Sequence, residues 1–307
     1  MTASPRSSPV EHAARVVVVA HRDNRRGALL MLLAVTFFSM GDAGAKWLSA
    51  DYPVLQVVFL RSIVAMLPLL VYLAASSGPG ALRTRHPAKH LLRSLLGIGF
   101  VSCLFYAYAH MPLANVVAIH FAAPLFITAL SMPLLGERVG PWRWGAVLVG
   151  FVGVLIMVRP RGEDFNLAAW VAVLGTLFYA LAVIVIRRIS RTETSAAIVF
   201  YNLVMAIGVS GAVTAFFWDP PVGWDWALFA LTGFLGGMAQ ICITNAFRLG
   251  EVSVVAPLEY LAILFATGFG YLIWGDIPGP WVGMGALVVV ASGLVILRRE
   301  VRARRAP

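Results

Sequence analysis

The stretch that decides the fold runs from Pro112 to Arg159 and reads PLANVVAIHFAAPLFITALSMPLLGERVGPWRWGAVLVGFVGVLIMVR. Shifted by 139 positions, it falls on Glu251 to Arg298, EVSVVAPLEYLAILFATGFGYLIWGDIPGPWVGMGALVVVASGLVILR. Both copies place a hinge of glycine, an acidic residue and Gly-Pro-Trp between two apolar runs, at 136–142 and 275–281. Apolar letters are shared easily in such a chain, but this hinge is not. The pattern predicts a duplicated membrane unit.

The composition supports a membrane protein. Of the 307 residues, 60% are hydrophobic and 12% are charged, whereas soluble proteins carry about 25% charged residues. A soluble core cannot bury so much apolar surface, but a bilayer can, so we expect an all-α polytopic membrane protein. The net charge of +10 does not indicate a nucleic-acid partner, because the basic residues lie in short loops and tails without interleaved aromatic residues.

Ten apolar runs have about the length that crosses the hydrocarbon core, roughly 20 residues each. Their separators are rich in glycine and proline, which is typical of turns. We expect a basic, disordered tail at 1–26, a first five-helix repeat at 27–160, a second at 161–298 and a basic tail at 299–307. The predicted spans are 28–49, 53–75, 89–110, 112–135, 141–158, 167–187, 196–217, 225–247, 251–274 and 280–297.

The basic residues predict the orientation of these spans. With the N-terminus in the cytoplasm, three basic residues fall at the outer ends of spans, Lys46, Arg159 and Arg161, and Arg61 lies within a span. The rest of the 24 Lys and Arg residues lie on the cytoplasmic side. This asymmetry predicts ten spans with both termini cytoplasmic. Because five spans per repeat is an odd number, the second repeat enters from the opposite side. Inverted repeats place a substrate site near the midplane, where the halves meet.

Ionisable residues inside spans are costly, at about 2.5–3.5 kcal/mol each, and face the bundle interior. Asp42 and Arg61 both lie roughly 10–12 Å below the predicted outer surface. They form either a structural ion pair or a counter-ion for a charged substrate, and the sequence leaves both interpretations open. Lys46 lies near the outer end of its span, where we expect it to snorkel to the interface.

His120 and Glu259 occupy the same position of the two repeats, followed by Phe121 and Tyr260. The first lies about 12 Å from the outside and the second about 12 Å from the inside. A single buried histidine is more often structural, but the paired occurrence predicts that both line a cavity. Protonatable groups there also permit proton coupling. Pro124 and Pro257 are expected to break helices around this cavity.

Amide and aromatic side chains complete the candidate site, although polar groups also hold membrane helices together. The sequence has no H-E-x-x-H, G-x-S-x-G, P-loop or Cys/His cluster, so no enzyme, cofactor or metal site is expected. We expect a small-molecule substrate and the bilayer as partners and no nucleic acid; a homodimer stays open. The predicted substrate-binding or gating residues are Asp42, Arg61, Tyr106, His120, Phe121, Asn202, Gln240, Asn245, Glu259 and Tyr260.

These features together resemble the drug/metabolite transporter superfamily, in its EamA-type branch. The resemblance covers nearly the whole chain after residue 26. It rests on the duplicated ten-span layout, P-L-F-x-x-x-L with G-E-R from Pro124 to Arg138, and L-F with G-D from Leu264 to Asp276. Asp276 stands where the family favours Glu. Ile263 stands where the first copy has Pro124, so the second helix break is expected at Pro257 instead.

The resemblance implies a secondary carrier of small organic metabolites with a central cavity between the repeats, in a bacterial inner membrane. VVAPLEYLAILFA at 254–266 is similar to a sub-branch with importers of riboflavin and of S-adenosylmethionine. An exporter of amino acids, drugs or other metabolites is the alternative within this class. A non-transporting scaffold or an intramembrane enzyme is the alternative from another class.

Overall fold

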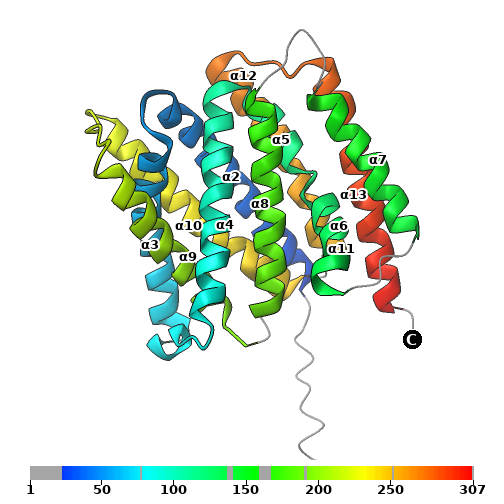
Figure 1. Ribbon diagram of the computed structural model, residues 1–307, viewed down its shortest axis with the longest axis horizontal. Coiled ribbons are helices and arrows are strands. Elements are labelled where there is room, and N and C mark those ends of the chain that lie inside the picture. Colours follow the sequence, from blue (N-terminus) through cyan, green and yellow to red (C-terminus); the bar gives the residue numbers. More distant parts are fainter. Residues whose placement is uncertain are drawn as a thin grey trace, which may run out of the picture.

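The computed structural model describes residues 23–76, 78–136, 141–158, 167–189, 192–250 and 252–305, and within these ranges it is helical, with no strand. The helices form one bundle (Figure 1). The first half comprises α2 Asn24–Asp51, α3 Val54–Ser76, η1 Pro79–Leu82, α4 Pro87–His110, α5 Leu113–His120, α6 Ala123–Leu135 and α7 Pro141–Val158. The second comprises α8 Leu167–Ile189, α9 Ser195–Thr214, α10 Asp225–Leu249, α11 Val252–Val255, η2 Ala256–Tyr260, α12 Leu261–Trp274 and α13 Pro280–Arg305.

The helices agree with the predicted spans to within about four residues, except that α13 continues past the predicted end at 297 to Arg305. Among the described residues, eight helical segments are long and apolar enough to cross a membrane, and two shorter apolar segments, Trp144–Val158 and Pro280–Val295, occupy the places of the other two predicted spans. Of the predicted tail at 1–26, the structure describes only residues 23–26, and residues 24–26 already belong to α2. The basic end from residue 299 continues α13 as far as Arg305.

The outer surface of the bundle is apolar. Large aliphatic side chains such as Val71, Leu264 and Leu287 are exposed by 69%, 67% and 73%. An apolar face of this extent on a soluble protein would drive aggregation, whereas in a bilayer it contacts lipid tails that are equally apolar. The chain is therefore a multi-pass membrane protein whose polar side chains must be sought inside the bundle.

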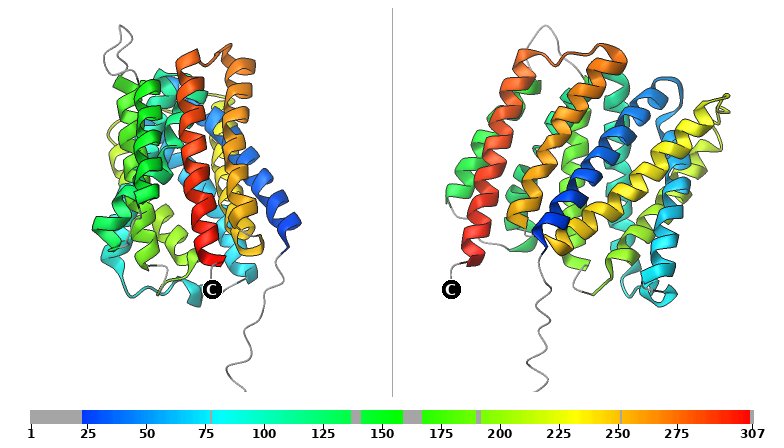
Figure 2. Two further views of the ribbon diagram at one scale, coloured as in Figure 1. Left: turned by 90° about the vertical axis from the view of Figure 1, so that its right-hand side faces the viewer. Right: turned by 180° about the vertical axis from the view of Figure 1, so that it is seen from behind.

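The packing of the helices has the two-fold symmetry of the repeat. Helix α2 packs on α10, and its counterpart α8 packs on α4. The self-related pairs also meet, α3 with α9 and α7 with α13. The start of α2 and the end of α13 lie at the same end of the bundle, as the views in Figures 1 and 2 agree. We call this the terminal end and the opposite one the distal end.

The hinge that the repeat shares forms the same turn twice. Gly136 ends α6 and Gly275 ends α12, both in the left-handed conformation with φ of 70°. Only glycine adopts this conformation without strain, and it lets the chain close each helical hairpin. The prediction that these positions are turns is confirmed for Gly136 and for Gly275–Asp276; the adjoining Glu137 lies outside the described residues.

Candidate functional site

A cavity of about 780 Å³ lies between the two halves of the bundle. Its lining includes Thr194, Gln240 and Thr244 toward the terminal end, of which Thr194 and Gln240 are exposed. At the distal end the lining stops at Val58, Phe105 and Tyr108, which are at most 2% exposed. The cavity therefore opens at the terminal end and is closed at the distal end.

Two broken helices meet at this cavity. In the first half, α5 ends at His120 and α6 starts at Ala123, with Pro124 in its first turn. In the second half, α11 passes into η2, which contains Pro257 and Glu259, and α12 follows. Proline lacks an N–H and is accommodated best in the first turn of a helix, which is where Pro124 and Pro257 lie as each helix restarts. The predicted breaks at Pro124 and Pro257 are confirmed, and both His120 and Glu259 line the cavity.

A polar cluster lies at the closed, distal end of the cavity. The hydroxyl of Tyr108 on α4 donates a hydrogen bond to Asp42 on α2, and Arg61 on α3 lies within electrostatic range of Asp42. The guanidinium of Arg61 also lies over the Phe105 ring, 5.0 Å from its centroid. A Cβ atom on Gly236 of α10 would come within 2.7 Å of Arg61 Nη2, so the absence of a side chain there leaves room for the guanidinium.

A second polar group lies nearer the open end. Asn202 on α9 passes over Gly97 on α4, where a Cβ atom would come within 2.9 Å of Asn202 Oδ1 and 3.6 Å of Arg93 Nη1. Gly97 and Gly236 are themselves 139 positions apart, so this crossing is the repeat counterpart of the Arg61–Gly236 crossing. Arg93 and Asn202 both line the cavity.

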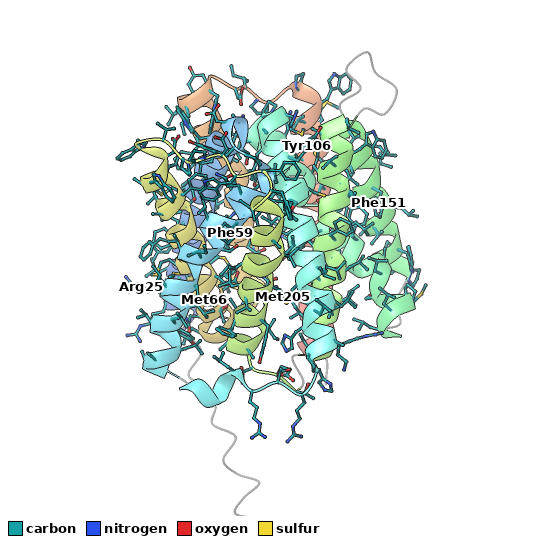
Figure 3. All side chains as sticks on the ribbon, turned by 60° about the vertical axis from the view of Figure 1, so that its left-hand side comes forward. Arg25, Phe59, Met66, Tyr106, Phe151 and Met205 are labelled. Atoms are coloured by element: carbon teal, nitrogen blue, oxygen red, sulfur yellow. The ribbon has the colours of Figure 1, made fainter. Side chains whose placement is uncertain are left out.

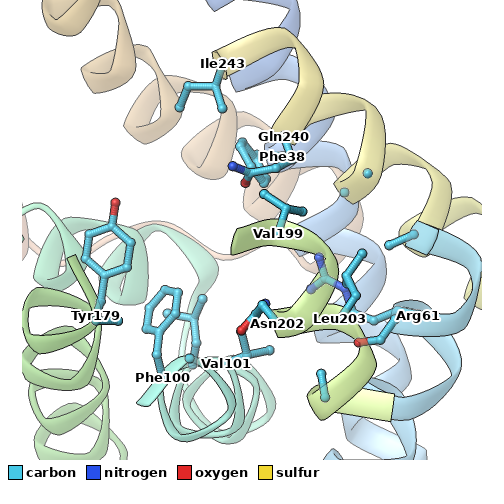
Figure 4. Close-up of a pocket in the computed structure, with 18 of the residues that line it drawn as sticks. Phe38, Arg61, Phe100, Val101, Tyr179, Val199, Asn202, Leu203, Gln240 and Ile243 are labelled. Atoms are coloured by element: carbon cyan, nitrogen blue, oxygen red, sulfur yellow. The ribbon is translucent and has the colours of Figure 1, made fainter. Parts of the chain in front are cut away.

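An aromatic wall connects the two polar groups. The ring centroids of Phe100 and His120 are 5.1 Å apart with nearly parallel planes, and Tyr179 lies 5.1 Å from Phe100 and 4.9 Å from His120. Figure 4 shows Phe100 and Tyr179 on one side of the cavity and Arg61 on the other. Aromatic faces beside a few polar groups are typical of sites that bind a small molecule with a ring.

Most of the predicted site residues come together at this cavity, and two do not. Tyr260 packs its ring 4.9 Å from Phe121 and points its hydroxyl at Gly293 of α13, so it supports the cavity from behind. Tyr106 stacks on His110 near the distal end of α4 (Figure 3). Neither side chain is among the described residues that line the cavity, and their predicted role in binding or gating stays a prediction. The predicted residues that do line it are Asp42, Arg61, His120, Phe121, Asn202, Gln240, Asn245 and Glu259.

Lys46, which we expected to snorkel to the interface, forms an ion pair at the distal end of the bundle. Its Nζ lies 2.6 Å from Asp276 Oδ2 and 4.5 Å from the centre of the Trp274 ring. The acidic residue of the second hinge thereby holds the distal end of α2. Local sequence gives no sign of this contact, because the partners are 230 residues apart.

Arg93 and Tyr179 line the cavity and were missed from the sequence. Arg93 lies near the start of its span, where the preference of basic residues for the cytoplasmic side is enough to explain an arginine. Its position along α4 nevertheless indicated that it faces the cavity. Arg93, Gly97, Val101, Leu104 and Tyr108 follow helical spacing and all line the cavity, so they form one face of the helix.

Loops of the two repeats are joined at both ends of the bundle. At the distal end, the backbone N–H of Asp219 donates to Gln56 Oε1 at 2.9 Å, and Tyr52 donates to Asp225. At the terminal end, Glu193 accepts the backbone N–H of Arg85 at 2.9 Å. We call these contacts the distal clamp and the terminal clamp.

The terminal clamp is centred on the carboxylate of Glu193, which has several donors around it. Glu193 Oε1 also accepts the Thr84 hydroxyl at 3.1 Å, and its Oε2 lies 3.6 Å from His90 Nε2. The backbone hydrogen bond from Arg85 is the largest of the effects that lower the pKa of Glu193 below its ordinary value. The clamp is therefore strongest while Glu193 is ionised.

Comparison with known proteins gives the same architecture. The sequence profile of the EamA-like transporter family matches residues 25–159 and 166–298. A solved crystal structure superposes with a TM-score of 0.63 at 20% identity, covering 90% of this chain and 99% of the other, and this likeness concerns the fold alone.

Curated relatives align along nearly their whole length. The pseudopaline exporter CntI of Pseudomonas aeruginosa strain UCBPP-PA14 is 31% identical, covering 90% of this chain and 97% of the relative. A riboflavin transporter of Rhizobium johnstonii is 30% identical, covering 92% and 94%. An S-adenosylmethionine uptake transporter of Rickettsia prowazekii is 27% identical, covering 89% and 93%. With a duplicated bundle, paired helix breaks and these matches, the chain belongs to the EamA-like transporter family.

Proposed function

We propose that this chain is a secondary carrier that moves a small polar organic metabolite across a bacterial inner membrane by alternating access, with both termini in the cytoplasm. The observation that carries the proposal is the central cavity. It lies between two inverted repeats and has ionisable groups at both helix breaks, His120 and Glu259. Carriers built from inverted repeats bind substrate at such breaks and rock around the site.

The size and lining of the cavity favour a metabolite with a ring. A volume of about 780 Å³ falls in the range of sites for drug-sized ligands, about 300–1,000 Å³. The first candidate substrates are riboflavin and S-adenosylmethionine, because two relatives are named as transporters of these compounds. Export is the alternative direction, and the relative named as a pseudopaline exporter favours it.

Proton coupling is part of the proposal. His120 and Glu259 are the protonatable groups at the two breaks, and both are reached from the cavity. A carrier that exchanges a proton for its solute needs a group that gains and loses a proton while access changes. A pH gradient is therefore expected to drive accumulation of the solute.

Flux into proteoliposomes tests the proposal. The full chain would be reconstituted and supplied with labelled riboflavin, S-adenosylmethionine and a set of amino acids, with and without a pH gradient. Saturable flux of at least one compound, above that of protein-free liposomes, is expected. Absence of such flux for every compound would favour a non-transporting membrane protein.

A further inference from the structure

Arg93 is the guanidinium group of the cavity that lacks an acidic partner. Its Nε and Nη1 atoms are enclosed and make no hydrogen bond, and within the described part of the chain no carboxylate forms an ion pair with it. The Oδ1 atom of Asn202, which lies over the same glycine, is also enclosed and unpartnered. Enclosed polar groups without partners are costly, which suggests that a ligand completes this site.

No described carboxylate forms an ion pair with Arg93, although Glu193 lies near the same stretch of α4, 3.6 Å from His90 Nε2. Gly97 lies one helix turn along α4, Asn202 faces it from α9, and Tyr179 of α8 lies within electrostatic range. Glu259 also lies within electrostatic range of Tyr179. By contrast, Arg61 at the distal end has Asp42 within the protein.

We infer that Arg93 and Asn202 bind a carboxylate group of the solute, whose ring packs on Phe100, His120 and Tyr179. That this carboxylate belongs to a transported solute rests on the proposed function. Guanidinium N–H groups bind a carboxylate through two parallel hydrogen bonds. The Asn202 amide faces this place with its Oδ1 acceptor, and with the amide rotated its N–H groups donate to the same carboxylate. Phe100 follows Arg93 by seven residues, about 10 Å along the helix, which suits a ring and a carboxylate joined by a short linker.

A carboxylate fits the charges of the cavity better than a phosphate does. Two guanidinium groups, Arg61 and Arg93, share the cavity with the two acidic side chains Asp42 and Glu259. A dianionic phosphate would add two negative charges to this set, whereas a carboxylate adds one. The site also divides the candidate solutes, because S-adenosylmethionine carries a carboxylate and riboflavin carries none.

A matched pair of probes tests the site without knowledge of the natural solute. N-acetyl-L-tryptophan and N-acetyl-L-tryptophanamide share one ring and differ only in having a carboxylate or a neutral amide. Their affinities for the purified full-length protein would be measured by titration calorimetry, with inorganic phosphate as a third probe. The acid is expected to bind at least about tenfold more tightly than the amide, since a guanidinium forms stronger hydrogen bonds with a charged acceptor than with a neutral one.

Variants of Arg93 connect this preference to the site. Arg93→Gln is expected to remove the preference for the acid over the amide, and Arg93→Lys to retain part of it. Arg83→Gln is the matched control, because Arg83 is an exposed arginine just before the same helix. A preference that persists in Arg93→Gln, equal or absent binding of acid and amide by the unaltered protein, or tighter binding of phosphate would each overturn the inference.

The outcome is separate from that of the proposed function. A preference for the acid that is lost in Arg93→Gln supports the site even if proteoliposomes show no flux. Conversely, flux of riboflavin that Arg93→Gln leaves unchanged, with equal binding of acid and amide, would support the carrier and overturn the carboxylate site.

Discussion

Two helix crossings flank the cavity, and they have the same backbone but different charges. At the first, Arg61 of α3 passes over Gly236 of α10; at the second, Asn202 of α9 passes over Gly97 of α4. Both glycines permit a close approach that a Cβ atom would block. At the first crossing the Asp42 carboxylate lies within electrostatic range of Arg61, whereas at the second the group in that range of Arg93 is the Tyr179 hydroxyl.

The difference shows how a duplicated fold can form an asymmetric binding site. Symmetric backbone contacts let the two halves move in equivalent ways, while the side chains at equivalent positions have diverged. The distal crossing is completed by Asp42 and Tyr108 and closes the cavity. The second crossing faces the open part of the cavity, where Arg93 and Asn202 can contact a solute. Each prediction below changes one side of this comparison.

The largest effect is expected from Arg61→Gln, which would leave the Asp42 carboxylate without its positive partner. Breaking an enclosed charge pair costs about 3–5 kcal/mol, and we expect about 2 kcal/mol here because Asp42 and Arg61 interact electrostatically without a direct ion pair. The thermal midpoint in detergent should fall and flux should be lost. Asp42→Asn combined with Arg61→Gln should recover most of the stability but not the flux; recovery of neither would contradict the pairing.

His120→Ala and Glu259→Gln are expected to reduce flux by at least about tenfold. Glu259→Gln should change stability by less than about 1 kcal/mol, because its side chain faces the cavity. His120→Ala should cost about 1–2 kcal/mol, because it also removes the ring contacts with Phe100 and Tyr179. Flux in proteoliposomes and thermal midpoints would be measured on matched samples. Tyr106→Phe, at a side chain of α4 outside the cavity lining, serves as control. Retained flux in both variants would contradict their assignment to the site.

Much of this comparison could be predicted from sequence, because the repeat spacing and Pro124 and Pro257 are local signals. The same spacing showed that His120 and Glu259 occupy equivalent positions of the two repeats. Arg93 could not be distinguished from a topological arginine, since its role depends on α9 crossing α4 at Gly97. Lys46 with Asp276 depends on long-range packing. Tyr260 shares the helix break with Glu259, but its direction is fixed by Gly293 on α13.

A smaller effect is expected at Lys46 and Asp276, the ion pair at the distal end. Asp276→Asn should lower the free energy of unfolding by about 1 kcal/mol or less, because such pairs near solvent contribute little. The exchanged pair Lys46→Asp with Asp276→Lys should restore part of the loss. Denaturation at low and high salt measures it, and an unchanged stability in Asp276→Asn would show that the pair contributes nothing.

The smallest effect is a pH dependence from Glu193 in the terminal clamp. Because the pKa of Glu193 in the folded protein lies below its ordinary value, its contribution is present at neutral pH. It is lost as the pH falls through the folded-state pKa. Thermal midpoints should therefore fall on acidification, and Glu193→Gln should flatten that profile. Equal slopes in the two proteins would remove Glu193 as the cause.

Counterflow tests the central claim most directly. Proteoliposomes would be loaded with an unlabelled compound that shows flux, then given the same compound labelled at low concentration outside. A carrier with one cavity that faces each side in turn should show faster entry and transient accumulation of label, because inside solute returns the cavity to the outside. Label entry that internal solute does not accelerate, or no entry of any compound, would contradict alternating access through this cavity.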